Sequence, residues 1–475
     1  MDLNILRENI QYSWWVLRIM SNREHRVLSL CGFLGYGFPK SSLDVGLSHL
    51  PDVVGVDNGS TDPGPYYLGS GKSLIKPAQL KRDLSIALNG SRQLQLPFVV
   101  GSAGTAGGEP HVASVLKILK TISREQRHTY RLAIIRSDLD KEFLKTFLKS
   151  GKIRPMGQIP ELTERELDLS TRVVGQMGVA PFIEAFEGGA DVIIAGRSCD
   201  TAIFASMAIM KGFDPGLAYH MAKIIECGAQ CAIPTGTNDS IIAKLRDDHF
   251  ELEAVNHNRR LTPTSVAAHM LYEQPEPHRF YEPEGVVDLS DVRMEQIDDR
   301  KVMVYGSKFH AAEQPTIKIE GAKLVGYRSI SIAGIVDPIL ISNLEDIQND
   351  VAATVDNMLL NSVGTYSLRF INYGKNGVSM APLSQDKVNP RELGVVIEVI
   401  ADDQETSDAV LALTRSTFLH SGFKGRKATG GNLAFPFSPS DFTGGPVYEF
   451  NVYHLMEVDD PKSLFTVEFE DINYK

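Results

Sequence analysis

VGSAGTAGGEPH, residues 100–111, is the stretch of this chain that says most about its fold. The aliphatic run Pro97–Gly101 leads into it, and a segment with helical spacing begins at Val112. Related glycine-rich segments follow other aliphatic runs at 30–37 (LCGFLGYG), 55–65 (GVDNGSTDPGP) and 195–202 (AGRSCDTA). A strand that ends in Gly, Ser, Thr and Asp delivers backbone N–H groups and short side chains to one edge of a sheet. Four such turns in the first half predict a ligand site along that edge.

Strands and helices alternate through this first half. Short runs rich in β-branched and aliphatic residues predict strands, and segments with helical spacing lie between them. The predicted strands are Arg26–Cys31, Asp52–Val56, Pro97–Gly101, Arg131–Arg136 and Asp191–Ala195. The predicted helices are Lys76–Leu88, Val112–Glu125, Asp140–Ser150 and Leu167–Glu187. The alternation predicts an α/β fold with a doubly wound, mostly parallel sheet covered by helices on both faces.

The second half has a different pattern. Its predicted strands include Lys301–Tyr305, Thr316–Ile319, Tyr327–Ile335, Tyr366–Ile371 and Gly394–Ala401, and its predicted helices are Asn343–Asn361 and Glu405–Leu419. Two helices among antiparallel-looking strands predict a C-terminal α+β domain of the ferredoxin-like type. We therefore expect an N-terminal extension at 1–25, an α/β domain with the glycine-rich ligand loops at 26–270, and an α+β domain at 271–475. We expect the C-terminal loop of the last domain to return toward the cleft. The first nineteen residues read as an extension, since MSNREHRVLSLCG from Met20 resembles a natural start.

Composition narrows the class of protein. The formal net charge is −11 and no compensating basic block occurs, which argues against nucleic acid as the main partner. No apolar run reaches the roughly 20 residues that a membrane-spanning helix needs. The four cysteines form no C-x-x-C pair, which favours a reduced, cytoplasmic protein without a zinc site.

The loop at 55–65 is the first candidate for ligand chemistry. Asp57 and Asp62 bracket its NGST segment, residues 58–61, and we interpret Asp57 as an acid/base group. Asp62, before Pro63, is equally well explained as an Asx turn or a helix cap. The loop's other predicted contacts with a substrate are Asn58, Ser60 and Thr61.

The loops at 100–111 and 195–202 offer groups that bind anions. Ser102, Gly104 and Thr105 precede a helix, where successive amides can hold a phosphate or carboxylate, although close packing of loop against helix is a rival explanation. The spacing matches neither G-x-G-x-x-G nor a P-loop, so a nucleotide cofactor is unsupported. Arg197 can make two parallel hydrogen bonds to an anion. Ser198 and Asp200 complete the predicted substrate contacts, and Asp200 could instead orient Arg197 or cap the next helix.

The helical stretch GLAYHMAKIIECGAQCA, residues 216–232, combines three ionisable groups with small and apolar neighbours. His220, Lys223 and Glu226 recur at i, i+3 and i+6, which we interpret as one buried face. Buried imidazole, amine and carboxylate groups are costly unless they pair or act on a ligand, and they tend to have shifted pKa values. We therefore predict all three as catalytic. The alternative is a Lys–Glu pair on a solvated face with His220 as a bystander.

Several motifs taken together resemble one known family. NGSTDPGPYYLGSG, AGRSCDTAIFASMAI, YHMAKIIECGAQC and GNLAFPFSPSDFTGGPVYEFNVYHLMEVDDP look like the acyclic terpene utilisation (AtuA-type) proteins, from about Arg26 to Glu468. The resemblance implies a role in catabolism through acyl-CoA intermediates but carries over no catalytic residue. Longer members of that family have an added small C-terminal domain, which some short members replace with a separate small protein. The resemblance therefore also implies a possible partner protein for this chain.

These observations lead to two functional expectations. The first is a lyase or hydro-lyase, such as a hydratase, that acts on a carboxylate or acyl-CoA. It would use acid/base chemistry without a cofactor, or with Mg²⁺ held between Asp57, Asp62 and Asp200 as the main alternative. The second is a non-catalytic binding or assembly subunit that needs a small partner protein. We also expect a homo-oligomer.

Overall fold

The computed structural model describes residues 23–359, 363–379, 390–427 and 430–474, and the chain divides into two compact units. Unit 1 takes in the described residues up to Ala322 and again from Phe450 onward, and unit 2 is Lys323–Glu449. The predicted N-terminal extension at 1–25 lies almost wholly outside the described residues. The division differs from the expected break after residue 270, because the strands between 279 and 322 belong to unit 1.

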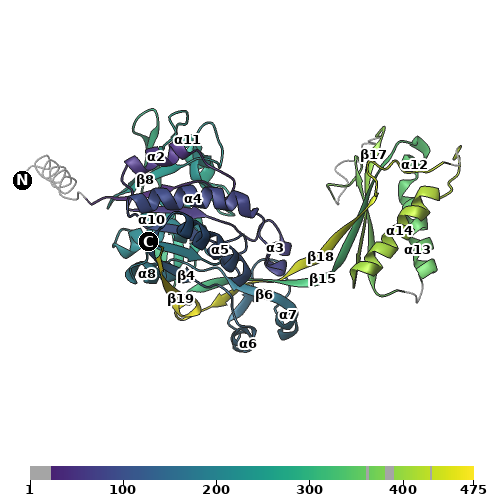
Figure 1. The fold of residues 1–475 in the computed structure, drawn as a ribbon, viewed down its shortest axis with the longest axis horizontal. Coiled ribbons are helices and arrows are strands. Elements are labelled where there is room, and N and C mark those ends of the chain that lie inside the picture. The colour runs from purple at the N-terminus through teal and green to yellow at the C-terminus, as the bar shows by residue number, and fades with distance from the viewer. Residues whose placement is uncertain (1–22, 360–362, 380–389, 428–429, 475) are drawn as a thin grey trace, which may run out of the picture. The chain divides into compact units, whose positions relative to one another are not determined.

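Unit 1 is built on a ten-stranded mixed sheet with the strand order β12-β13-β9-β8-β1-β2-β3-β7-β4-β19. Figure 1 labels β8, β4 and β19 of this sheet. Its five central strands run parallel, and their outer neighbours pair antiparallel. The central strands are β1 (His25–Ser29), β2 (Val53–Asp57), β3 (Phe98–Gly101), β7 (Val192–Ala195) and β4 (Thr129–Ile135). The outer strands are β8 (Ile241–Leu245), β9 (Phe250–Ala254), β13 (Lys301–Tyr305), β12 (Arg293–Gln296) and β19 (Val467–Asn473). The predicted α/β class is confirmed, whereas the doubly wound connectivity remains a prediction.

Helices cover both faces of this sheet, because side chains along each central strand alternate between two cores. Val27, Val53 and Val99 belong to one core, and Leu28, Val54 and Phe98 belong to the other. The first core also contains residues of α8 (Ala180–Glu187), α9 (Asp200–Met210) and α10 (Pro215–Ile225). The second contains residues of α2 (Lys40–Ser48), α4 (Pro77–Gln93) and α5 (Glu109–Glu125).

Two predicted elements differ from the structure. The stretch predicted as one helix over Leu167–Glu187 is α7 (Glu164–Leu169), strand β6 (Ser170–Gly175) and then α8. The β-branched residues of STRVVG favour a strand, and this strand pairs with β15 (Thr316–Ile335). The two strands predicted over Thr316–Ile319 and Tyr327–Ile335 are this single long strand.

The other elements of unit 1 are short. The strands are β5 (Ile153–Pro155), β10 (Arg279–Glu282), β11 (Gly285–Asp288) and β14 (Lys308–Ala311). The helices are α3 (Pro65–Ser70), α6 (Lys141–Lys149), α11 (Pro263–Met270) and the 3₁₀ turns η1 (Gly228–Cys231) and η2 (Pro461–Leu464). Strands β10, β11 and β14 form an antiparallel sheet of their own.

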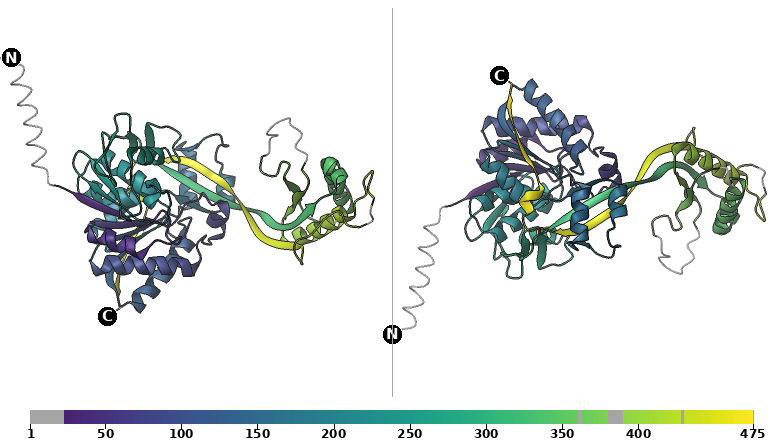
Figure 2. Two further views of the ribbon diagram at one scale, coloured as in Figure 1. Left: turned by 90° about the horizontal axis from the view of Figure 1, so that it is seen from above. Right: turned by 90° about the horizontal axis from the view of Figure 1, so that it is seen from below.

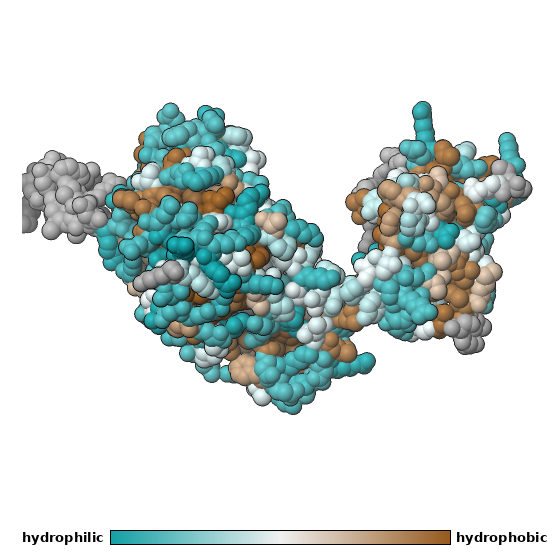
Figure 3. Space-filling model, in the orientation of Figure 1, coloured by the Kyte–Doolittle hydropathy of each residue, from teal (hydrophilic) through white to brown (hydrophobic). Residues whose placement is uncertain are grey.

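Unit 2 contains antiparallel strands and helices with a separate core. β17 (Leu393–Ala401) pairs antiparallel with β15 and with β16 (Tyr366–Tyr373), while β15 also neighbours β18 (Asp441–Glu457). The helices are α12 (Pro338–Ser342), α13 (Leu344–Leu359) and α14 (Gln404–His420). β15 and β18 lie side by side and connect the units (Figure 2). Apolar residues also gather on the visible surface of unit 2 (brown in Figure 3). The ferredoxin-like connectivity remains a prediction.

Candidate functional site

The glycine-rich loops meet at the carboxyl ends of the central strands, and Asn58 joins three of them. Its Nδ2 donates to the carbonyl of Leu34 (2.8 Å), and its Oδ1 accepts from the backbone N–H of Gly104 (2.6 Å). A Cβ on Gly59 would lie 2.1 Å from the carbonyl oxygen of Thr105, so the second and third loops touch through their backbones. Asn58 and Gly104, both predicted substrate contacts, therefore hold the loops together.

Ser102 and Thr105 also make their contacts within the protein. The N–H of Ser102 donates to the carbonyl of Gly196 (3.1 Å), and the hydroxyl of Thr105 accepts from the N–H of Leu74 (2.8 Å). Both residues have positive φ, 42° and 96°, which residues other than glycine rarely adopt. These bonds fix the loop in a strained conformation, and they use groups that were predicted to form an anion cradle.

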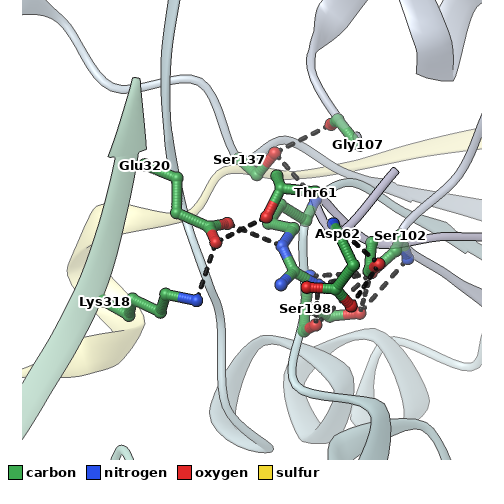
Figure 4. Close-up of polar contacts among 10 residues, drawn as sticks. Thr61, Asp62, Ser102, Gly107, Ser137, Ser198, Lys318 and Glu320 are labelled. Carbon is green, nitrogen blue, oxygen red and sulfur yellow. Dashed lines mark hydrogen bonds and ion pairs between the residues drawn. The ribbon is translucent and has the colours of Figure 1, made fainter. Parts of the chain in front are cut away.

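Arg197 bonds to members of a buried polar network, among them Ser198 and Glu320, which Figure 4 labels. Its Nε donates to Glu320 (2.8 Å) and its Nη1 donates to the Ser198 carbonyl (3.1 Å), with side chains only 4% and 0% exposed for Arg197 and Glu320. Thr61 donates to Glu320 (2.7 Å), and Lys318 pairs with the same carboxylate (2.8 Å). Burial alone would raise the pKa of Glu320, but Arg197 and Lys318 outweigh it and lower this pKa to about 2. The predicted anion-binding arginine thus has an internal carboxylate partner.

Ser60 and Asp62 form a local turn at the exposed side of these loops. The hydroxyl of Ser60 donates to Asp62 (2.7 Å) and accepts from the N–H of Asp62 (3.1 Å). This local bonding agrees with the interpretation of Asp62 as a turn residue. The charge of Asp62 still acts on Asp200, so the turn lies near the groups described next.

Asp57 and Asp200 are the predicted site residues with unused hydrogen-bonding capacity, and we call them the acid pair. Asp57 ends β2 and is buried, whereas Asp200 begins α9 and is partly exposed. Oδ2 of Asp57 accepts from the N–H of Gly59 (3.0 Å), but Oδ1 of each carboxyl group is buried without a hydrogen-bond partner among the described residues. Burial, and then the charge of Asp200, raise the pKa of Asp57 well above its usual range. Burial also raises the pKa of Asp200, while Arg197 and Lys223 oppose it.

Lys223 and Glu226 come from the end of α10 and interact with the acid pair. Lys223 Nζ donates to Glu226 Oε1 at 2.5 Å, and the two side chains are 11% and 3% exposed. Burial raises the pKa of Glu226 to about 8; Lys223 opposes this shift and the charge of Asp200 adds to it. Two of the three groups predicted on this helix are therefore electrostatically coupled to Asp200.

His220 is not part of this cluster. It is fully buried, its Nδ1 lies 2.7 Å from the hydroxyl of Ser307 and its Nε2 lies 2.9 Å from the sulfur of Met270. Burial lowers the pKa of His220 to about 3, so the ring is neutral at physiological pH. His220 and Glu226 do not share one face of the helix, because a step of three residues falls short of a full turn and two such steps add up. Six residues place the two side chains about 120° apart.

Several residues of the site lie outside the glycine-rich loops and the helical stretch from which the sequence analysis predicted the site. Lys318 and Glu320 come from β15, and Glu282 ends β10. Glu282 accepts a hydrogen bond from Thr201 (2.7 Å) through one oxygen, and its other oxygen, Oε2, is buried without a partner among the described residues. Its pKa is raised well above the usual range, chiefly by burial. In the sequence, a buried carboxylate in a strand of alternating polar and apolar residues cannot be distinguished from a solvent-exposed one. Only the structure identifies Glu282 as buried.

Metal-binding clusters and membrane-spanning helices do not occur within the described ranges. No group of three His, Cys, Asp or Glu side chains there has an arrangement that would hold a metal ion. The magnesium alternative between Asp57, Asp62 and Asp200 remains an untested prediction. No helix in the same part of the chain is long and apolar enough to cross a membrane.

Comparison with known proteins identifies the family. No curated protein and no solved structure gives a significant match to the chain. The family model described as "Acyclic terpene utilisation family protein AtuA" matches residues 97–436, well over half of the 475 residues. The match covers the third glycine-rich loop, the start of α9 with Asp200, and α10, and it confirms the resemblance seen in the motifs. The chain therefore belongs to the acyclic terpene utilisation family.

Proposed function

We propose that unit 1 carries out acid/base chemistry next to a carbonyl group, as a lyase or hydro-lyase acting on a carboxylate or acyl-CoA. The observation that carries the proposal is the acid pair, in which Asp57 and Asp200 each have a buried oxygen without a partner among the described residues. Buried polar atoms are nearly always hydrogen-bonded, so an exception needs an explanation. At the carboxyl edge of parallel strands, a bound ligand is such an explanation.

The two carboxyl groups of the acid pair are suited to opposite roles. Arg197 and Lys223 stabilise the charged form of Asp200, whereas the charge of Asp200 disfavours a second charge on Asp57. This arrangement favours the protonated form of Asp57 together with the charged form of Asp200 over the reverse distribution. Environments that drive two pKa values apart in this way provide one general acid and one general base.

A dehydration would use both groups in one step. Asp200 removes a proton from the carbon next to the carbonyl, the electron pair forms a carbon–carbon double bond, and Asp57 protonates the departing hydroxyl, which leaves as water. Hydration is the same step in reverse. Lys223 acts on Asp200 electrostatically, and Glu226, with its pKa near 8, is suited to take up the proton of Asp200 between turnovers.

Hydrogen exchange on a panel of candidate acids tests this proposal. Family membership selects branched 3-hydroxy and 2-unsaturated carboxylic acids and their CoA esters as the panel. Incubation of a substrate with the protein in D₂O should introduce deuterium at C2 of the substrate. NMR and mass spectrometry measure this incorporation. Asp200→Asn should slow exchange by roughly 10²-fold or more, the usual scale for an acid/base group. Asp44→Asn, an exposed aspartate on α2, is the matched control and should leave the rate unchanged.

The same assay separates the alternatives. Undiminished exchange in Asp57→Asn and Asp200→Asn would rule out the acid pair as the reacting groups. Activity that is lost with a chelator and restored by Mg²⁺ would favour the metal-assisted version. Binding of panel members without any exchange would favour the alternative of a binding subunit that needs a partner protein.

A further inference from the structure

A cavity of about 460 Å³ in unit 1 reaches the start of α9, the helix that begins with Asp200 of the acid pair. Its volume is in the range of small-molecule sites. Cys199, the residue before Asp200, lines it, and so does Lys318, whose amine bonds to Glu320 in the network around Arg197. The cavity therefore shares a wall with the candidate site, although no residue of the acid pair lines it.

One side of the cavity carries a cation that the fold leaves unpaired. Arg154 lies on β5 and is exposed, and within the described part of the chain it has no ion-pair partner. Lys318, the other cation in the wall, already has an ion-pair partner in Glu320, which it shares with Arg197. A guanidinium without a carboxylate partner is well suited to hold a ligand carboxylate with two parallel hydrogen bonds.

The wall also carries a carboxyl group that can act as a hydrogen-bond donor. Glu282 lines the cavity, and burial raises its pKa well above the usual range, which favours the protonated form that can donate a hydrogen bond. One of its oxygens accepts from Thr201, and Oε2 has no partner among the described residues. The rest of the lining includes apolar side chains such as those of Met156, Val286 and Leu455.

We propose that this cavity binds a small carboxylic acid with an apolar body and a second oxygen. Arg154 holds the carboxylate, the apolar wall holds the body, and Glu282 contacts the second oxygen. Any use of the bound acid in catalysis rests on the proposed function, whereas the cavity's capacity to bind such an acid does not. Of the two substrate classes in the proposed function, a free carboxylate and an acyl-CoA, the cavity favours the free carboxylate. The reason is that Arg154, the cation that would bind the carboxylate, lines the cavity itself.

Binding of simple acids tests the carboxylate subsite. Hexanoate and hexanamide have the same body and differ in charge, and neither offers a group for the proposed chemistry to eliminate. Titration by NMR should show hexanoate binding at least about tenfold more tightly than hexanamide, as expected for one charge-assisted contact. Arg154→Met should reduce hexanoate affinity to that of hexanamide. Arg165→Met is the control, since this exposed arginine on α7 does not line the cavity, and it should change nothing.

Two further variants test the position of the ligand. Ala312→Phe fills the cavity from its partly exposed rim and should abolish binding of both probes. Wild-type protein should bind 3-hydroxyhexanoate several-fold more tightly than hexanoate, and Glu282→Leu should remove this preference while retaining the preference for hexanoate over hexanamide. Melting temperatures close to wild type establish that each variant is folded.

The outcomes distinguish the inference from the proposed function. Equal affinities for hexanoate and hexanamide, or hexanoate binding that survives both Arg154→Met and Ala312→Phe, would overturn the cavity assignment. Charge-dependent binding in this cavity without any hydrogen exchange on the acid panel would leave the cavity assignment standing and count against the acid/base chemistry.

Discussion

Among single residues, Glu226 gives a pH-dependent prediction whose sign can be worked out. Its pKa rises from 4.5 to about 8 on folding, so between these values the folded chain holds a proton that the unfolded chain has released. Its stabilising contribution is complete below about pH 4.5 and is lost as the pH rises through 8. Glu226→Gln should therefore lose less stability than wild type between pH 5 and pH 8, by on the order of 1 kcal/mol or more. Urea unfolding at both pH values measures this difference, and parallel losses would show that Glu226 does not titrate in this range.

Arg197 gives a second prediction at this scale, and it concerns folding. In Arg197→Met the buried negative charge of Glu320 would lose one of its two cationic partners. This loss should cost about 3–5 kcal/mol of stability. Arg197→Met combined with Glu320→Gln should recover part of this loss, because the buried charge is removed. Arg165→Met should stay within about 0.5 kcal/mol of wild type. A cost for Arg197→Met near that of the surface control would mean that the arginine is free for a ligand.

At the scale of elements, the contact between the second and third glycine-rich loops is tested by two glycines with positive φ. A Cβ on Gly59 (φ 155°) would meet the backbone of Thr105, whereas a Cβ on Gly64 (φ 110°) would meet nothing within 4 Å. Gly64→Ala should therefore cost only the conformational strain, about 1–3 kcal/mol. Gly59→Ala should cost clearly more, because two backbones must separate. Denaturant unfolding of both variants measures the difference, and equal costs would show that the loops tolerate separation.

The elements also show what the sequence can predict of the fold. The central strands were predicted within about two residues, because buried parallel strands are continuous aliphatic runs bounded by Gly and Asp. Strand β6 was missed because its six residues follow α7 directly and lie within a longer apolar, helix-compatible stretch. The pairing of β19 with β4 joins residues more than 300 positions apart, and no local pattern records such a pairing.

The candidate site was predictable to the extent that it depends on strand ends. Asp57 ends β2 and Asp200 follows β7, so the parallel sheet brings them to one edge, as the loop motifs indicated. Glu282 and Glu320 come from strands outside the parallel core, and their depth depends on packing that only the structure shows. The motifs also led to an excess of predicted ligand contacts, since Asn58 and the Ser102 amide serve the contact between loops.

At the scale of the whole molecule, the two units have separate hydrophobic cores. The cores around the ten-stranded sheet contain no residue of Lys323–Glu449 among those described, and the core of unit 2 contains only residues from 333 to 435. Unit 2 takes in the later part of β15 and the first part of β18. A Cβ on Gly321 would lie 2.9 Å from Cβ of Val452, so the ends of unit 1 are adjacent where the chain leaves and returns.

This arrangement predicts that unit 1 folds without unit 2. Replacing Lys323–Glu449 by a short glycine-containing turn removes no residue from the cores of unit 1, and it shortens a connection that already joins neighbouring strands. The shortened chain should give a cooperative unfolding transition, well-dispersed NMR signals and the same affinity for hexanoate as the full chain. A matched chain that also carries Ala312→Phe should fold and lose that binding. An aggregated or unfolded product would show that unit 2 supplies stability to unit 1. A folded product that has lost hexanoate binding would place part of the ligand site in unit 2.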